Sequence, residues 1–428
     1  MNLKTPKGTR DFLPEEMIVR QNMIDTLKGI FERYGFSPLE TPIFELYSVL
    51  SSKYAGGSEI LKETFKFKDQ GDRELALRYD LTVPFAKVIG TNPQLKMPFK
   101  RYAIGPVFRD GPIASARYRQ FIQCDVDVVG VKQMAADAEI IALTDTAFKA
   151  FGFNATIKIN NRKLLNGLLS YCGIKKSDLE KTIIIIDKMD KVGKEGVKKE
   201  LRENDITEQI ITKIFALFTI TGTNENKLQE LSNLKLDEEG KAGLEELGKV
   251  VSFCKALSVE PEVTLSLARG LAYYTGTVFE TYLIGSNVKS AVCAGGRYDE
   301  MIGKFLGNVE MPAVGISFGL DRLYDALIEK EKSTQKTVTE LYIIPIGTLE
   351  QSLSIAKQCR DAGVKVDLDL RNKGISKNLD YANSLGIPFV LLIGENELKD
   401  GKLKLKDMKT GKEELGNIEE IIEKIQPS

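Results

Sequence analysis

Three arginines of the chain lie among small residues, where a guanidinium group could approach a ligand closely. Arg109 occurs in GPVFRDGPIASARYRQF, Arg269 in LARGLAYYTGTVFE and Arg322 in PAVGISFGLDRL. Guanidinium is planar, always charged and able to bind phosphate or carboxylate oxygens through two parallel hydrogen bonds. These positions indicate chemistry on an anionic substrate. Read singly, the three segments also fit a solvated basic hairpin, an ordinary turn with core tyrosines, and strand–helix packing.

The sequence contains no histidine. This excludes serine and cysteine nucleophiles activated by histidine, and metal sites built on histidine. Catalysis must therefore rest on arginines, carboxylates, backbone groups and Mg²⁺. Compositional drift is the simplest explanation of the missing residue type.

Two further segments carry weaker signals. Asp80 and Thr82 in LRYDLTVPFAK could hold an ammonium group and a hydroxyl or water, although such a pair is more often a turn or helix N-cap. Gly295 and Gly296 in AGGRYDEMIGKF permit close backbone approach to a ligand, and a tight turn explains them equally well.

Charge is concentrated locally and balanced overall. The 428 residues have 60 basic and 60 acidic side chains, so a polyanion would have to be bound by local patches. One such patch lies between residues 96 and 119, where Asp110 is outnumbered by Lys96, Lys100, Arg101, Arg109, Arg117 and Arg119. The net charge of +5 suits a triphosphate or an RNA end.

The remaining composition predicts a cytoplasmic enzyme. The five cysteines are an odd number without a close pair, which argues against disulfides and a cysteine zinc site. The N-terminal segment lacks the apolar core of a signal peptide, and no run of about 18 apolar residues predicts a membrane span.

Periodicity predicts an N-terminal helix over 15–34, an extended segment over 36–44 and another helix over 135–151. Strands are expected at 75–78, 99–108, 121–129, 277–283, 288–293 and 313–317. Residues 171–258 are rich in Lys and Glu with helical apolar spacing. The run Ile183–Ile186 alone suggests a strand, but Leu179, Ile183 and Ile186 recur at helical spacing and favour a helix.

The C-terminal region reads as a separate α/β domain. Residues 329–338 are a polar linker, followed by strands over 341–346, 365–370 and 388–394 with helices between them. A short strand is expected between the Gly-Lys pairs at 401–402 and 411–412, and a helix over 417–425.

Taken in order, these segments resemble class II aminoacyl-tRNA synthetases. The helix and the Pro42 segment resemble the dimer-forming motif, and the Arg109 and Arg322 segments resemble the second and third motifs. LARGLAYYTG, AGGRYDEMI and the opening KGTRDFLPEE are similar to peptides of histidyl-tRNA synthetases, and LGIPFVLLIGENELKDGKLKLKDMKTGKEE resembles their anticodon-binding domain.

The resemblance implies an α+β protein of four parts. A class II catalytic domain with an antiparallel sheet would comprise residues 1–170 and 259–328. A helical insertion would occupy 171–258, and the linker 329–338 would lead to an anticodon-binding α/β domain at 339–428. The implied substrates are L-histidine, ATP with Mg²⁺ and tRNA(His), the implied assembly is a homodimer, and no zinc, haem or flavin is expected.

The resemblance also implies roles for individual residues. Arg269 and Arg109 would be catalytic, acting on the α-phosphate. ATP would be held by Arg109, Arg117, Phe121 and Arg322, with Phe121 stacking on adenine. Histidine would be held by Asp80, Thr82, Arg109, Gln123, Asp127, Arg269, Tyr273 and Tyr274. Within that set Asp80, Thr82 and Gln123 would grip the ammonium group, whereas Asp127 and Tyr274 would read the imidazole.

Three positions depart from the family pattern. Asp80 replaces a frequent Glu, Ala272 replaces the usual Asp, and Ala116 stands where many members have Gly. The second departure puts the orientation of Arg269 or Tyr274 in doubt, and the third the freedom of the loop.

Three alternatives remain. A regulatory subunit of ATP phosphoribosyltransferase resembles this catalytic domain, but such subunits typically lack the anticodon domain and lose phosphate-binding arginines. A threonyl or prolyl enzyme is disfavoured by LARGLAYYTG and by the lack of Cys/His zinc ligands. A non-catalytic RNA-binding module is disfavoured by zero net charge.

Overall fold

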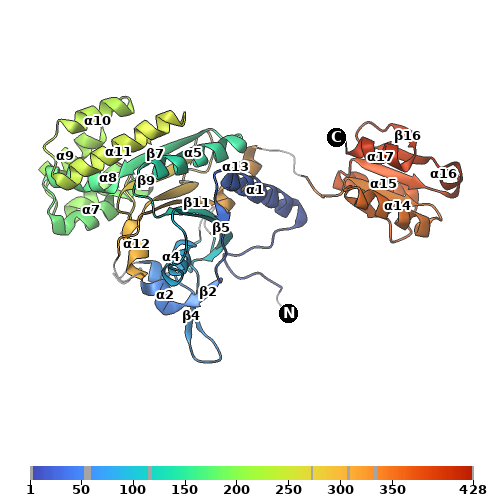
Figure 1. Cartoon of the computed structure of the whole chain (residues 1–428), viewed down its shortest axis with the longest axis horizontal. Coiled ribbons are helices and arrows are strands. Elements are labelled where there is room, and N and C mark those ends of the chain that lie inside the picture. Colours follow the sequence, from blue (N-terminus) through green and yellow to red (C-terminus); the bar gives the residue numbers. More distant parts are fainter. Residues whose placement is uncertain are drawn as a thin grey trace. The chain divides into compact units, whose positions relative to one another are not determined.

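A large mixed sheet is the framework of one of the two compact units into which the chain divides. This unit comprises Met1–Arg10 and Met23–Lys330. The computed structural model describes residues 3–52, 59–113, 118–270, 273–305, 309–330 and 335–426 (Figure 1). In these residues the sheet has eight strands, in the order β1 (Ser37–Pro38), β5 (Phe99–Phe108), β6 (Gln120–Val129), β11 (Ala313–Gly319), β10 (Cys293–Arg297), β9 (Thr277–Leu283), β7 (Ala155–Asn161) and β8 (Glu262–Val263).

The six central strands are antiparallel, whereas β1 and β8 pair in parallel with β5 and β7 at the edges. Residues directly opposite each other on neighbouring strands share a face of the sheet. The register therefore determines which side chains from separate motifs lie together.

One face of this sheet is packed with apolar side chains from helices. Phe31 of α1 (Pro14–Arg33) lies 5.8 Å from the ring of Phe318 on β11, and Phe148 of α5 (Ala135–Ala150) lies 6.1 Å from the same ring. Helix α11 (Glu238–Ala256) packs on α5 and β7, and α13 (Leu320–Lys330) follows β11 without a loop. The acidic side chains of β6 lie on the opposite face of the sheet.

A helical cluster is gathered at one end of the sheet (Figure 1). It contains α6 (Arg162–Cys172), η1 (Lys176–Asp178), α7 (Leu179–Ile186), α8 (Met189–Glu203), α9 (Glu208–Phe218), α10 (Asn224–Ser232) and α11. Helix α7 confirms the helical reading of the isoleucine run, with Leu179, Ile183 and Ile186 buried in the cluster's core. The same core contains Ala268, the residue before Arg269.

Helices α6 and α11 cross at unusually short range. A Cβ on Gly167 would lie 2.4 Å from the Cα of Gly240, so only glycine allows the two backbones to meet there. Helix α6 begins at Asn161, whose side chain accepts hydrogen bonds from the amides of Lys163 and Leu164. This crossing fastens the cluster to the end of β7.

A smaller sheet and its helices complete the unit. Strands β2 (Phe44–Leu46), β4 (Glu74–Leu77) and β3 (Lys66–Lys68) are antiparallel. They accompany α2 (Tyr47–Ser52), α3 (Glu59–Lys62), α4 (Thr82–Thr91) and α12 (Asp299–Phe305). Helix α4 packs against α2 and α12.

The second unit comprises Asp11–Asn22 and Glu331–Ser428. Its sheet has the order β13 (Val366–Leu368), β12 (Leu341–Pro345), β14 (Phe389–Ile393), β15 (Leu403–Asp407) and β16 (Glu413–Gly416). The first three strands are parallel and joined through α14 (Leu349–Asp361) and α15 (Ile375–Leu385), which confirms the predicted βαβαβ order. Helix α16 (Glu395–Asp400) follows β14, and α17 (Ile418–Ile425) closes the chain from a capping box at Asn417 and Glu420.

The α+β fold predicted from the sequence is confirmed, and one expected strand was wrong. The segment 288–293 was expected to be a strand because of its valines, but β10 begins only at Cys293 and runs through Gly295 and Gly296. Glycine is needed in this strand because the neighbouring strands leave no room for a side chain: a Cβ on Gly295 would lie 2.1 Å from the carbonyl oxygen of Gly315. The boundaries of the four predicted domains stay predictions.

Candidate active site

Strand β6 presents a row of polar side chains to the face of the sheet that the helices leave open. Phe121, Gln123, Asp125 and Asp127 alternate with Cys124 and Val126, which are completely buried on the other face. Side chains two apart along a strand are separated by about 6.8 Å. The row therefore extends from the expected adenine position at Phe121 to the expected imidazole position at Asp127.

Asp127 is held from two sides. Its Oδ2 lies 2.7 Å from the guanidinium of Arg101, whose side chain is 0% exposed, and its Oδ1 accepts a hydrogen bond from the hydroxyl of Tyr298. Burial raises the pKa of Tyr298 well above its ordinary value, and the Asp127 carboxylate raises it further. Tyr298 therefore keeps its proton and donates a hydrogen bond to Asp127.

Beside Asp127 the surface of the sheet is formed by two glycines, Gly315 and Gly296, which together are called the floor. Gly315 lies opposite Asp127, and Gly296 lies opposite Gly315 on the next strand. A Cβ on Gly315 would lie 1.9 Å from Asp127 Oδ1, and one on Gly296 would lie 2.9 Å from the ring of Tyr274. This floor is where a flat ligand could rest on the sheet.

Two tyrosines lie near this floor. The rings of Tyr273 and Tyr274 are 4.5 Å apart, and the ring of Tyr273 meets that of Tyr298 edge-on at 6.4 Å. Burial raises the pKa of Tyr274, against an opposing effect of Arg269. Both predicted tyrosines therefore belong to the same cluster as Asp127 and Tyr298.

Arg269 lies on the far side of the floor from Asp125 and Asp127. Its guanidinium donates a hydrogen bond to Glu280 Oε1 and lies 5.9 Å from the centroid of the Tyr274 ring. Burial alone would lower the pKa of Arg269, but Tyr274 and Glu280 outweigh burial and raise it. In register, Glu280 is three strands from Asp125, through Ala294 and Ser317, a span of about 14 Å.

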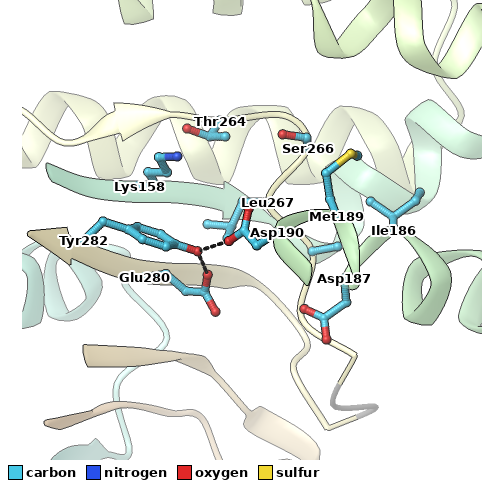
Figure 2. A pocket seen from close by; sticks show the side chains of 11 residues that line it. Lys158, Ile186, Asp187, Met189, Asp190, Thr264, Ser266, Leu267, Glu280 and Tyr282 are labelled. Atoms are coloured by element: carbon cyan, nitrogen blue, oxygen red, sulfur yellow. Dashed lines mark hydrogen bonds between the residues drawn. The ribbon is translucent and has the colours of Figure 1, made fainter. Parts of the chain in front are cut away.

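The helical cluster contacts the segment that carries Arg269. Asp187, which follows α7, accepts a hydrogen bond from the backbone amide of Gly270. Figure 2 shows the adjoining cavity of about 50 Å³, where the hydroxyl of Tyr282 points between Glu280 and Asp190, at 2.5 and 2.6 Å. Because a phenol has one proton, only one carboxylate can receive it at a time.

Arg109 lies between two aromatic rings. Its guanidinium carbon is 4.2 Å from the ring centroid of Tyr79 and 4.9 Å from that of Phe121. Its backbone amide donates to the carbonyl of Arg119, which ties the ends of the hairpin together. Stacking fixes the plane of the guanidinium and directs its N–H edge outward.

The basic hairpin is less of a phosphate surface than its net charge suggested. Arg101 forms an ion pair with Asp127, Arg119 lies 3.1 Å from Asp110, and Lys100 lies 2.8 Å from Glu139. Arg109 is the hairpin arginine that the described structure places among the predicted site residues.

Asp80 serves the start of a helix, as the alternative reading allowed. Its Oδ1 accepts hydrogen bonds from the amides of Thr82 and Val83, at 3.1 and 2.9 Å, in the first turn of α4. Gln123, the other residue expected at the ammonium group, donates from Nε2 to Ser317 Oγ at 2.6 Å.

The third motif has the predicted strand-to-helix form. Arg322 lies in the first turn of α13, and its Nη1 donates to the carbonyl of Ala291 at 2.6 Å. The preceding residue, Asp321, accepts from the amide of Ile122 on β6 at 2.9 Å, which joins this helix to the hairpin. Arg117, Ala116 and Ala272 lie outside the described residues.

Sequence reasoning missed several residues of this site. Tyr298 lay inside a quoted motif but was given no role, and Asp125 could have been found from the two-residue alternation of β6. Glu280 closes the motif that begins at Arg269, so its position was a usable signal. No spacing in the sequence connects Arg101 with Asp127.

Two family profiles match the chain. The family profile for histidyl-tRNA synthetase matches residues 8–323, and that for an anticodon binding domain matches residues 340–427. The chain belongs to the histidyl-tRNA synthetase family. It is an aminoacyl-tRNA ligase.

Relatives of this synthetase family match over nearly the whole chain. Histidine–tRNA ligase 1 of Bacillus cereus is 44% identical over 418 residues, which cover 96% of this chain and 97% of the relative. The crystal structure of histidyl-tRNA synthetase from Nostoc superposes with a TM-score of 0.87, at 32% identity and 99% coverage of both chains.

A third match bears on the main alternative. A structure described as an ATP phosphoribosyltransferase regulatory subunit/histidyl-tRNA synthetase from Bacillus halodurans has a TM-score of 0.75, covering 89% of this chain and 96% of its own. Its identity of 24% shows a common fold alone. The synthetase relatives are closer in sequence, and the regulatory-subunit reading is not favoured.

Two properties of the described residues complete the picture. None of the described helices is long and apolar enough to cross a membrane. All five cysteines are buried as free thiols.

Proposed function

We propose that this chain activates L-histidine with ATP and transfers the histidyl group to tRNA(His), using the site on the open face of the large sheet. The observation that carries the proposal is the position of Arg269. It is held by Glu280 across a small-residue floor from Asp127, so a fixed cation and a hydrogen-bonding cluster flank the glycines on which a flat ligand could lie.

The imidazole would be read by the cluster around Asp127. The proton of Tyr298 is committed to Asp127, so the phenol oxygen is left to accept a hydrogen bond from a ring N–H. Tyr274 and Tyr273 would enclose the ring, with Tyr274 as the partner of the second ring nitrogen. Asp127 would thus act through Tyr298, because Arg101 occupies its second oxygen.

The other end of histidine would lie toward α4 and the hairpin. Asp80, Thr82 and Gln123 are proposed to hold the ammonium group, and Arg109 and Arg269 to contact the carboxylate. Arg109 suits this role because its plane is fixed between two rings.

ATP, as its Mg²⁺ complex, is proposed to bind along the hairpin. Phe121 would stack on adenine, Arg109 would bind the α-phosphate, and Arg117 and Arg322 would bind the γ-phosphate. The close join between Asp321 and Ile122 supports this arrangement, because it brings the Arg322 helix to the strand that carries Phe121.

In the first step the histidine carboxylate attacks the α-phosphorus and pyrophosphate leaves. The nucleophile is already ionised, so positioning and neutralisation of phosphoryl charge are enough. Arg269 would stabilise the charge that develops at the α-phosphate. In the second step a ribose hydroxyl of tRNA attacks the adenylate carbonyl, the bond to the phosphate breaks and AMP leaves, and we propose a phosphate oxygen of the adenylate as the base.

The decisive experiment is ATP–pyrophosphate exchange with each of the twenty amino acids. A site built to hydrogen-bond a substrate group rejects analogues that lack it by about 10⁴-fold to 10⁵-fold. Exchange should therefore depend on histidine. Exchange driven by threonine or proline instead would overturn the assignment.

We also propose a cytoplasmic homodimer in which the second unit binds the anticodon. The dimer rests on the resemblance of α1 and the Pro42 segment to the class II dimer motif, and a two-fold interface is expected. Light scattering that finds an active monomer at assay concentration would contradict it.

A further inference from the structure

A chain of hydrogen bonds fixes two polar side chains at the centre of the site. Gln123 donates from Nε2 to Ser317 Oγ at 2.6 Å, and the Ser317 hydroxyl bonds to the carboxylate of Asp125. A serine hydroxyl has one proton. Since Asp125 accepts it, Ser317 must itself accept from Gln123, which determines which end of the Gln123 amide faces it.

This arrangement leaves two buried acceptors on the same face of β6, two residues apart along the strand. Within the described residues, Gln123 Oε1 and Asp125 Oδ1 have no hydrogen-bond partner, and Asp125 is only 2% exposed. A buried carboxylate oxygen without a partner is costly, so a ligand that supplies donors would be strongly favoured there. Gln123 Oε1 and an ionised Asp125 Oδ1 can only accept hydrogen bonds, so a ligand must supply the donors.

The surroundings identify the kind of donor. Two arginines interact electrostatically with Asp125: Arg101 is already paired with Asp127, and Arg78 donates to backbone carbonyls of Thr41 and Pro106. Asp80 is a further acidic neighbour, so the excess charge at this point is negative. A small cation with several N–H bonds satisfies these acceptors together, and a primary ammonium group has three such donors.

We propose that Asp125 is an additional binding residue for the α-ammonium group of the amino-acid substrate, acting with Gln123. This inference rests on the proposed function and deepens it, because it adds a residue to the site without changing the reaction. The carboxylate of Asp125 and the amide oxygen of Gln123 accept from the ammonium, while Ser317 holds both in place.

The test compares ligands that differ in the ammonium group. Isothermal titration calorimetry on the full-length protein would use L-histidine, L-histidinol and imidazole-4-propionate, the last of which lacks the ammonium. For Asp125→Asn, affinity for the first two ligands should fall about 10-fold to 100-fold, as expected for a hydrogen bond to a charged group. The fold loss of affinity for imidazole-4-propionate should be at least tenfold smaller than the loss for the other two ligands.

Control measurements separate this contact from a general disturbance. Asp361→Asn removes an exposed carboxylate that lies 2.5 Å from Lys357, and it should bind all three ligands normally. The KM for ATP should be unchanged in Asp125→Asn. Circular dichroism would establish that this variant is folded, and Ser317→Ala provides a second route, because it frees both side chains and should reproduce the ligand pattern more weakly.

The outcomes are distinct. Equal losses for all three ligands, or no loss for histidine, would overturn the ammonium contact. If the wild-type protein binds another amino acid in place of histidine, the proposed function fails. The ammonium contact is then decided with that amino acid and its deamino analogue.

Discussion

Glu280 and Arg269 form an ion pair between β9 and the irregular segment that precedes it, and the pair fixes the guanidinium against the sheet. The side chain of Arg269 is 21% exposed and that of Glu280 is 11% exposed, so water screens the pair poorly. Arg269 therefore has its orientation before a substrate arrives.

Removing the charge of Glu280 should disturb catalysis through this orientation. For Glu280→Gln, the kcat of pyrophosphate exchange should fall about 10-fold to 100-fold, in keeping with the loss of a charge-assisted hydrogen bond. The KM for histidine should change much less than kcat. A variant with wild-type kcat would show that Arg269 needs no such support.

Replacing Arg269 itself should have a larger effect. One preorganised donor to developing charge is worth about 10²-fold to 10³-fold in rate, so Arg269→Ala should lose at least that much pyrophosphate exchange while remaining folded. Arg269→Lys should recover only part, because an ammonium group cannot reproduce a planar two-pronged contact. Normal exchange by the alanine variant would remove Arg269 from the reaction.

Tyr298 should contribute to histidine binding and not to ATP binding. In Tyr298→Phe the ring stays but the acceptor oxygen is lost and Asp127 loses a donor. The KM for histidine should rise about 10-fold, with the KM for ATP unchanged. Tyr342→Phe is a matched control, because this buried hydroxyl bonds to Asn378 in the other unit. Parallel changes in both Michaelis constants would argue for a structural role.

The free energy of unfolding should depend on pH through Asp125. Burial raises the pKa of Asp125 to about 7, Arg101 opposes this, and Asp127 adds to it. Ser317 forms a hydrogen bond with Asp125 and opposes the increase, and Asp125 also interacts electrostatically with Asp80, Arg78, Tyr298 and Cys293. Between about pH 4 and pH 7 the folded chain thus holds a proton that the unfolded chain has released, so this group makes stability fall as pH rises.

The measurement is the melting temperature of wild type and Asp125→Asn, without substrate, at pH 5 and pH 8. The variant cannot ionise, so its stability relative to wild type should increase with pH. A difference that is constant across this range would mean that Asp125 titrates normally. Saturating histidine should reduce the advantage of the variant at pH 8, because the ammonium group stabilises the charged carboxylate.

The part of the second unit that follows Lys330 should serve tRNA and not activation. Ending the chain after Lys330 should spare histidine-dependent exchange and sharply lower tRNA charging, because the polar row of β6 and Arg269 belong to the first unit. Equal charging by the shortened and whole chains would refute this division. The shortened protein must first be shown to be folded.

The sequence predicted elements well where a pattern repeated. Spacing alone identified α7, although four consecutive isoleucines suggested a strand, because a helix places Ile183 and Ile186 on one buried side. It failed at β10, because glycines in a strand interior carry no β signal. Their reason is the close approach of neighbouring strands, which is a property of the assembled sheet.

The site was predicted less completely than the fold, since its charges are paired over long separations in sequence. Arg101 was counted with the phosphate-binding arginines, yet the register of β5 and β6 places it opposite Asp127, where it is spent on a carboxylate. Family resemblance assigned Asp127 to the imidazole. It did not indicate that Asp127 would act on the imidazole through the hydroxyl of Tyr298.

Ala268 is buried in the core of the helical cluster, and the next residue is Arg269. We therefore expect that the helices cannot be removed to make a minimal enzyme, since one peptide bond joins their hydrophobic interior to the arginine proposed to act on the α-phosphate. A loss of packing inside the cluster, such as Ile183→Ala, should give Arg269 more positional freedom. Among related proteins, substitutions in these helices should accordingly be few near Ala268 and frequent on the outer surfaces of the helices.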